Sequence, residues 1–282
     1  MNNVDAAFPV SDLALARRLE LTEGRASASF VDARAKVDPD ARAQRIEVAG
    51  ALAMFDTPAS PMTQTFGLGL SGMPSAADLE QIERFYDERE SPTLHEVSPV
   101  EDPAIVPLLS GRGYRPIELT SVLYRPTGMA FPLGWVADGR IQVREAAESE
   151  SPRWVDLAVQ GWEASGELAE TLRAIGRLHA HVPGLFLFIA ELDQRPIAMA
   201  EVFIWEGVAL LAGACTLPAA RRQGAQLALT EQRLRFAAGR GCDLAMVCGL
   251  PGGPTQRNAE RRGFRIAYTR TKWRREPRPF ME

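Results

Sequence analysis

Cysteine is scarce in this sequence, and long apolar runs are missing. The 282 residues include three cysteines, at positions 215, 242 and 248, and none of them form a C-x-x-C pair. This excludes a disulfide framework or a C-x-x-C metal site and favours a reducing compartment. No run reaches the roughly 18 apolar residues that a membrane span needs. The first residues also lack the basic and apolar regions of a signal peptide. We therefore expect a cytoplasmic protein with no membrane partner.

An excess of positive charge is missing as well. The net charge of −4 at pH 7 disfavours a protein that binds nucleic acid by neutralising its phosphates. The charge is unevenly spread, because residues 1–130 carry −7 and residues 131–282 carry +3. An anionic ligand is therefore expected to bind the second half of the chain.

The composition is that of a globular protein, with 46% hydrophobic and 24% charged residues. At this length the chain forms one large domain or two ordinary ones. Residues 126–139, PTGMAFPLGWVADG, are rich in proline and glycine and are the best candidate for a linker. We expect an N-terminal domain at 1–126, a linker at 127–139 and a C-terminal domain at 140–282.

The two halves show the same order of predicted elements: strand, helix, strand, helix, a glycine-aromatic pair and strand. This order occurs at 62–124 and again at 208–273. From residue 94 to residue 125 the second copy aligns without gaps at an offset of 150 residues, so that Gly113-Tyr114 matches Gly263-Phe264. The similarity indicates a repeated α/β unit, and two unrelated α/β stretches with a shared turn remain the alternative.

Hydrophobic periodicity and capping signals give the expected elements. Ser11 is the expected cap of the first helix, and Ser75-x-x-Asp78 is a capping box. Helices are predicted at 12–37, 76–86, 102–109, 154–162, 168–179, 226–238 and 255–261, and a break of the first helix near Gly24 is the alternative to a continuous one. Strands are predicted at 48–55, 62–70, 94–97, 116–124, 141–144, 185–190, 196–205, 208–216, 244–247 and 264–273.

The most informative stretch runs from 208 to 224, VALLAGACTLPAARRQG. An apolar strand leads into a proline turn, then into Arg221, Arg222, Gln223 and Gly224 directly before a helix. A basic turn with a glycine at a helix start is typical of an anion site, because free amides and the helix dipole attract negative charge. A helix start with solvated arginines is the alternative interpretation.

This turn resembles the signature of the GNAT superfamily of acyl-coenzyme A-dependent N-acyltransferases. The signature is Arg/Gln-x-x-Gly-x-Gly/Ala at the start of a helix that follows a long strand. Here Pro218, Arg221, Gly224 and Gln226 stand at the matching positions. CDLAMV then matches the next strand, and QRNAERRGF the short helix with its Gly-Phe ending. The resemblance covers roughly 140–275, and the first half looks like a degenerate copy without an Arg-x-x-Gly turn.

The resemblance implies a fold, an activity and a set of binding residues. The fold would be α/β, as two tandem GNAT-like mixed sheets flanked by helices. The activity would be transfer of an acetyl group from acetyl-CoA to an amine by direct attack, with both substrates bound. The pantetheine arm would lie between strands 208–216 and 244–247, which splay apart. The residues implied in coenzyme binding are Cys215, Leu217, Arg221, Arg222, Gln223, Gly224, Ala225, Gln226 and Asn258.

The chain departs from the family at three positions that bear on catalysis. Gln226 replaces a small residue, so its side-chain amide is a candidate phosphate donor. Ala259 stands where many members have a tyrosine acid, and the 208–216 strand lacks their glutamate. Strand alternation offers Glu201 as a substitute base, because it is a lone carboxylate on the apolar face of strand 196–205. A structural, partnered Glu201 is the alternative.

Several other motifs carry little weight. Residues 67–72, GLGLSG, match G-x-G-x-x-G, but Pro74 intervenes before the helix, so a dinucleotide site is not supported. His179 and His181 have no third metal ligand at a recognisable spacing, and no metal is expected. Cys215 is better interpreted as a buried small hydrophobe than as a nucleophile.

We therefore expect a cytoplasmic N-acetyltransferase of the GNAT type that acts on a small-molecule amine. Acetyl-CoA would be the acyl donor, with no metal and no nucleic-acid partner. A coenzyme A-binding protein without turnover, serving as a sensor or scaffold, is the alternative.

Overall fold

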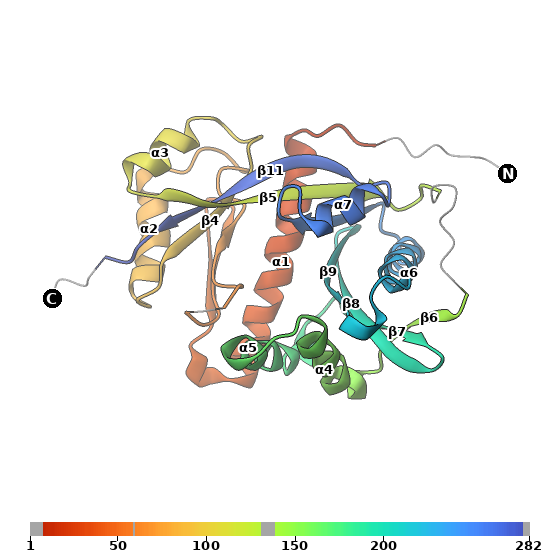
Figure 1. The fold of residues 1–282 in the computed structure, drawn as a ribbon. Coiled ribbons are helices and arrows are strands. Elements are labelled where there is room, and N and C mark those ends of the chain that lie inside the picture. The colour runs from red at the N-terminus through yellow and green to blue at the C-terminus, as the bar shows by residue number, and fades with distance from the viewer. Residues whose placement is uncertain (1–7, 59, 131–138, 279–282) are drawn as a thin grey trace. The chain divides into compact units, whose positions relative to one another are not determined.

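The computed structural model describes residues 8–58, 60–130 and 139–278. These residues form two compact units (Figure 1). Unit 1 comprises residues 124–247 and 261–264 together with residue 8, and unit 2 comprises 9–123, 248–260 and 265–278, within the described ranges. Most of the expected linker, 131–138, lies outside the described residues. The domain boundaries expected from the sequence stay a prediction. Each unit also includes segments from the C-terminal part of the chain: 261–264 in unit 1, and 248–260 and 265–278 in unit 2.

Unit 2 is a mixed sheet with helices packed on it. Its strand order is β1-β2-β3-β4-β11-β5. Its helices are α1 (Leu13–Val37), α2 (Ala76–Asp87), α3 (Ile105–Gly111) and α7 (Pro254–Glu260). Its strands are β1 (Gln44–Val48), β2 (Ala51–Phe55), β3 (Thr65–Phe66), β4 (Thr93–Val97), β5 (Arg115–Pro126) and β11 (Arg265–Arg275), of which β5 runs on into unit 1.

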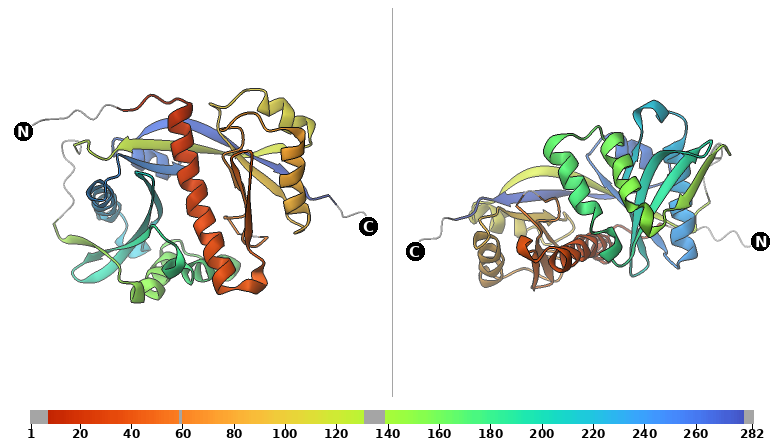
Figure 2. Two further views of the ribbon diagram at one scale, coloured as in Figure 1. Left: turned by 180° about the vertical axis from the view of Figure 1, so that it is seen from behind. Right: turned by 90° about the horizontal axis from the view of Figure 1, so that it is seen from below.

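Helix α1 is continuous and packs on β1, β2 and β3 (Figure 2). Its cap is Asp12, whose carboxylate accepts from the amide of Leu15 at 2.9 Å, so the expectation that Ser11 caps it is wrong. The Ser11 hydroxyl donates instead to the carbonyl of Ala267. Gly24 allows close packing rather than a break, since a Cβ there would lie 2.9 Å from Cβ of Phe66.

A buried ion network ties α1 to the sheet of unit 2. Arg270 on β11 pairs with Glu20 at 3.1 Å, Glu23 at 2.7 Å and Glu96 at 3.0 Å. The Tyr268 hydroxyl donates to Glu20, whose pKa burial raises to about 7. Three carboxylates thus share one buried guanidinium.

Two predicted strands of unit 2 are shorter than expected. The 48–55 segment holds the last residue of β1 and all of β2, because Ala49 and Gly50 take positive φ values of 50° and 79° in the hairpin turn that joins β1 to β2. The 62–70 segment holds only the two residues of β3. Gly67 and Gly69 turn the chain out of the strand at φ values of 80° and 87°.

Unit 1 has the strand order β10-β9-β8-β7-β6. Its helices are α4 (Ser151–Gly161), α5 (Gly166–Gly176) and α6 (Ala225–Gly239). Its strands are β6 (Ile141–Glu145), β7 (Leu185–Leu192), β8 (Arg195–Trp205), β9 (Val208–Thr216) and β10 (Leu244–Gly249), of which the last two residues belong to unit 2.

Helices α4 and α6 cover opposite faces of the unit 1 sheet. Leu187 and Ile189 of β7 join the apolar cluster around α4. Phe186 and Phe188, which alternate with them along β7, stack edge-on against Phe236 of α6. These side chains of β7 thus alternate between the α4 face and the α6 face of the sheet.

Each half contains a parallel strand pair at the corresponding place. β3 pairs with β4 in parallel at Thr65 and His95, and β9 pairs with β10 in parallel. The other pairs described are antiparallel, including β11 with β4. The expected mixed α/β class, with helices flanking the strands, is confirmed.

Candidate functional site

The parallel strands β9 and β10 of unit 1 separate after a short contact. They pair only from Val208 to Leu210, opposite Leu244 to Met246, within the described part of the chain. β9 then continues to Thr216. Its edge from Leu211 to Thr216 is therefore open toward β10, as expected for strands that splay apart. An open edge can accept an extended ligand as a further strand would.

The turn after β9 leaves the start of α6 without a cap. Gly224 is the residue before the helix at φ 91°, and no side chain caps it. Arg222, two residues earlier, is also left-handed at φ 65°. A backbone of this kind gathers amides into a concave anion site, and the helix dipole adds positive potential.

The space around Gly224 is open. A Cβ at this position would meet only Cδ1 of Ile141, at 3.9 Å. Helix α2 of unit 2 differs, because Ser75 and Asp78 close its first turn with a complete capping box. The Asp78 carboxylate accepts from the amide of Ser75 at 2.8 Å and places a negative charge there. Of these two helix starts, only that of α6 suits an anion.

The two arginines of the turn differ in their partners. Arg221 donates to the carbonyl of Gly161 at 3.0 Å and pairs with Glu163 at 2.8 Å. It therefore ties the turn to the end of α4. Arg222 and Gln223 are exposed, and Ala225 is buried as the first residue of α6.

Gln226 links α6 back to the end of β9. Its side-chain amide donates to the Thr216 hydroxyl at 3.0 Å. The amide expected to reach a phosphate thus holds the turn against the strand in this structure. This bond could not be foreseen from the family pattern, which has a small residue there.

The backbone groups of Cys215 and Leu217 were expected to face the coenzyme, and in the structure they face β8 or the turn. Leu217 donates its amide to Ile197 at 2.9 Å, and its carbonyl accepts from Ala220. The register places Cys215 opposite Met199, so by alternation its backbone also faces β8. Alternation turns the amide and carbonyl of Thr216 toward the open edge instead. The Cys215 thiol is buried against Leu157, and burial raises its pKa to about 12, which confirms a packing role.

Asn258 lies on α7, in unit 2, and is exposed. The other predicted site residues all belong to unit 1. Ala259, at the position of the family tyrosine, is buried.

Glu201 lies at an irregularity between β8 and β9. It pairs with Leu187 and shares a strand face with Met199, and both of these pack in the cluster around α4. The side chain is thus on an apolar face, as expected. Burial raises the pKa of its carboxyl to about 7, against the opposing field of Arg233. Within the described ranges no hydrogen bond to this carboxyl is formed.

Two residues that build this irregularity were missed from the sequence. β9 has one extra residue opposite β8, and Gly213 adopts φ 49° within it. Arg233 of α6 is 4% exposed and hydrogen-bonds the backbone there. A glycine inside an apolar strand is a recognised sign of a bulge, whereas a buried arginine has no such local signal.

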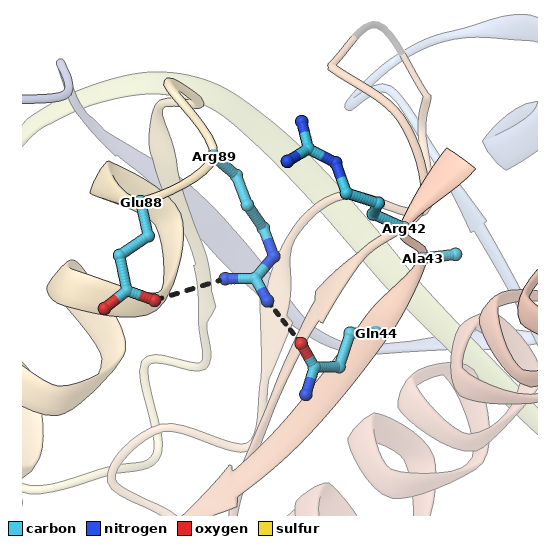
Figure 3. Close-up of a pocket in the computed structure, with 5 residues that line it drawn as sticks. All are labelled: Arg42, Ala43, Gln44, Glu88 and Arg89. Atoms are coloured by element: carbon cyan, nitrogen blue, oxygen red, sulfur yellow. Dashed lines mark hydrogen bonds and ion pairs between the residues drawn. The ribbon is translucent and has the colours of Figure 1, made fainter. Parts of the chain in front are cut away.

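Two hollows of about 390 Å³ lie elsewhere and hold no predicted site residue. One, in unit 1, lies between α4 and α5, with Val155, Asp156 and Arg173 in its wall. The other, in unit 2, is shown in Figure 3, where Arg89 reaches both Gln44 and Glu88. It lies beyond the C-terminal end of α2, where the helix dipole disfavours an anion.

The histidine pair lies in the short helical turn at residues 179–181. His179 is buried, its Nδ1 lies 3.1 Å from the Ser151 hydroxyl, and burial lowers its pKa to about 4. The described residues contain no cluster of three or more metal-ligating side chains. They also contain no helix with the length and apolarity to cross a bilayer.

Comparison with known proteins gives one sequence relative and many structural ones. The family model "Acetyltransferase (GNAT) family" matches residues 145–264. Aminoglycoside N(6')-acetyltransferase type 1 of Klebsiella aerogenes is 36% identical over 112 residues, a match covering 36% of this chain and 72% of that enzyme. The family match therefore includes the whole segment from β9 to α7.

Solved structures extend the similarity over both halves. A GCN5-related N-acetyltransferase from Kribbella flavida has a TM-score of 0.62 at 17% identity, over 89% of this chain and 94% of that one. A tandem GNAT protein from the clavulanic acid biosynthesis pathway has a TM-score of 0.56 at 12% identity, over 81% and 74%. These similarities show the fold alone. The sequence matches show that the chain belongs to the GNAT acetyltransferase family and is an enzyme that transfers an acetyl group to an amine.

Proposed function

We propose that the acyl donor is acetyl-CoA and that it binds in unit 1, at the start of α6 and along the open edge of β9. The observation that carries this proposal is the uncapped helix start at Gly224, with open space around it. The amides of residues 222–226 would hold the pyrophosphate. The edge from Leu211 to Thr216 would pair with the pantetheine arm.

The chain's own residues set up the transfer of the acetyl group. Acetyl-CoA supplies an activated thioester carbonyl, and the amine attacks it directly. Cys215 is not proposed as an intermediate acceptor, because its thiol is packed in the apolar cluster around α4 and burial raises its pKa. Arg221, held by Glu163, and Gln226, held by Thr216, keep the turn in place before the coenzyme binds.

Glu201 would act as the general base. An ordinary amine is an ammonium ion at pH 7 and must lose a proton before it can attack. A carboxyl with a pKa near 7 can take that proton directly or through a water molecule. Ala259 offers no proton for the leaving thiolate. As the bond from the amine nitrogen to the acetyl carbon forms and the bond from that carbon to sulfur breaks, the thiolate is proposed to take the second proton that the nitrogen loses.

The acceptor is proposed to be a small molecule that carries a primary amine. The aminoglycoside acetyltransferase to which the chain is similar supports this class.

Only one coenzyme is proposed to bind per chain. In the first half Ser75 and Asp78 close the start of α2, and Glu101 lies against Gly69 in the loop after β3.

The experiment is a thermal-shift panel with acetyl-CoA, coenzyme A and NAD at equal concentration, followed by an assay for free thiol with a panel of aminoglycosides and simple amines. A ligand that binds the folded chain raises the midpoint by mass action. We expect acetyl-CoA to stabilise and at least one amine to release thiol. Stabilisation by NAD alone would contradict the donor assignment.

A further inference from the structure

Arg233 of α6 reaches the β8–β9 pair at the bulge. Its Nη1 donates to the carbonyl of Glu201 at 3.1 Å and to that of Ala212 at 3.2 Å. Its Nε donates to the carbonyl of Leu229 at 3.2 Å, within its own helix. Since Glu201 and Ala212 are register partners, one buried nitrogen holds both strands at the same level.

The bulge explains why a cation is placed there. An extra residue on β9 interrupts the ladder, and buried carbonyls without partners are costly. An arginine can donate to two carbonyls at once and stays charged when buried. Its pairing with two backbone oxygens satisfies them and brings a positive charge to the sheet beneath Glu201.

The Glu201 carboxyl lies over the same bulge. A Cβ at Gly213 would come within 2.7 Å of Cδ and 2.9 Å of Oε1 of Glu201. Gly213, left-handed at φ 49°, therefore leaves the space in which the carboxyl sits. The bulge, the Glu201 carboxyl and the Arg233 guanidinium therefore form one structural cluster.

We infer that Arg233 is a positioning residue for Glu201: it fixes the bulge that seats the carboxyl and its charge keeps that carboxyl available as a base at neutral pH. This inference rests on the proposed function for its catalytic consequence, though not for the placement itself.

Arg233 is the charged group that acts on the Glu201 carboxyl among the residues described. β9 carries no charged side chain. The other charged side chains on the elements around β8 have other partners or line another surface: Arg153 and Glu191 pair with Glu150 and Arg144, Asp156 lines the α4–α5 hollow, and Glu231 and Arg235 pair with each other.

The test compares Arg233→Gln, which keeps donors but loses the charge, with Arg233→Lys, which keeps the charge. The Glu201 carboxyl is titrated by infrared difference spectroscopy, with Glu201→Gln in each background as the blank. We expect the midpoint in Arg233→Gln to rise by about one pH unit and that in Arg233→Lys to stay near wild type. An unmoved midpoint in Arg233→Gln would overturn the inference.

The pH profile of kcat/KM supplies the catalytic readout. In Arg233→Gln the low-pH limb of this profile should shift to higher pH together with the carboxyl midpoint, so that activity recovers at high pH. An equal loss of kcat at every pH in both variants would show a merely structural role. The infrared titration remains valid if Glu201 is not the base, which separates failure of this inference from failure of the proposed function.

Gly213→Ala tests the same structural cluster if Arg233→Gln does not fold. The added methyl group would displace the carboxyl while leaving the buried cation in place. We expect kcat to fall and the Glu201 midpoint to shift. Wild-type kcat and midpoint in Gly213→Ala would contradict the inference.

Discussion

The carboxyl of Glu201 occupies the space that a side chain at Gly213 would fill. The two residues lie on adjacent strands, at the level where β9 carries one residue more than β8. A carboxylate seated in this way loses water without gaining a hydrogen bond, and its pKa rises to about 7. The bulge thereby links the backbone of the sheet to the proposed chemistry of proton transfer.

Glu201 should lower the free energy of unfolding at alkaline pH. Its carboxyl has a pKa of about 7 in the folded chain, against 4.5 ordinarily, so folding favours its protonated form. The resulting stability is present below pH 4.5 and is lost as the pH rises through 7. Glu201→Gln should therefore be more stable than wild type at pH 8, by at most about 3 kcal/mol.

Urea denaturation at pH 5 and pH 8 measures this difference. At pH 5 the two proteins should be nearly equal in free energy of unfolding. A Glu201→Gln variant that is less stable than wild type at pH 8 would show that the carboxylate has a stabilising partner.

The start of α6 should be sensitive to a side chain at Gly224. Gly224→Val places a branched side chain at a left-handed position, where the phosphate is proposed to approach. We expect acetyl-CoA to lose its stabilising effect on this variant while the fold remains. Calorimetry with acetyl-CoA is the measurement.

Gly241→Val is the matched control. Gly241 follows the other end of α6 and is left-handed at φ 81°, and a Cβ placed there would meet no atom within 4 Å. The backbone strain should be similar, roughly 1–2 kcal/mol, in both variants. Unchanged acetyl-CoA affinity in Gly224→Val, or equal loss in both, would show that the site is misplaced.

Each chain should bind one coenzyme. The start of α2 is closed by the Ser75 hydroxyl and the Asp78 carboxylate, and hydrogen bonds to Ser75 lower the pKa of Asp78. The carboxylate thus stays charged at neutral pH and repels phosphate. A calorimetric titration with acetyl-CoA should give one equivalent, and two equivalents would refute the degenerate first half.

Arg270 should be essential to the stability of unit 2. Arg270→Met would leave Glu20, Glu23 and Glu96 without their shared cation, at a cost of roughly 3–5 kcal/mol. Arg274→Met, four residues along β11, removes an exposed pair with Glu276 and should cost less than about 0.5 kcal/mol. Equal urea midpoints for the two variants would show that the network does not stabilise the fold.

Local signals predicted one strand of the proposed site and one helix start of the other unit well. The apolar run at 208–216 lies between Gly207 and Pro218, and β9 has the bounds that were expected. The Ser75–Asp78 capping box forms as predicted. Such features depend on neighbouring residues, so they can be recognised without the rest of the fold.

Features that depend on distant residues could not be predicted. Nothing near residues 265–275 indicates that β11 pairs with β4, because the partners are far apart in sequence. The Leu217 amide donates to Ile197 of β8, and the register that sets this contact includes a bulge that the local sequence does not specify. In the sequence, Arg233 resembles an ordinary helical arginine. Only the structure shows that it donates to the carbonyls of Glu201 and Ala212.

The rate of acetyl transfer by Glu201→Gln, measured between pH 6 and 9 with saturating acetyl-CoA, tests the central claim most directly. Glutamine keeps the shape of the side chain and removes its basicity. We predict turnover lower by roughly 10²–10⁴-fold at pH 7, a smaller loss at pH 9 where more amine is neutral, and little change in acetyl-CoA affinity. Wild-type turnover with an unmoved pH profile would contradict the account and leave proximity of the two substrates as the source of catalysis.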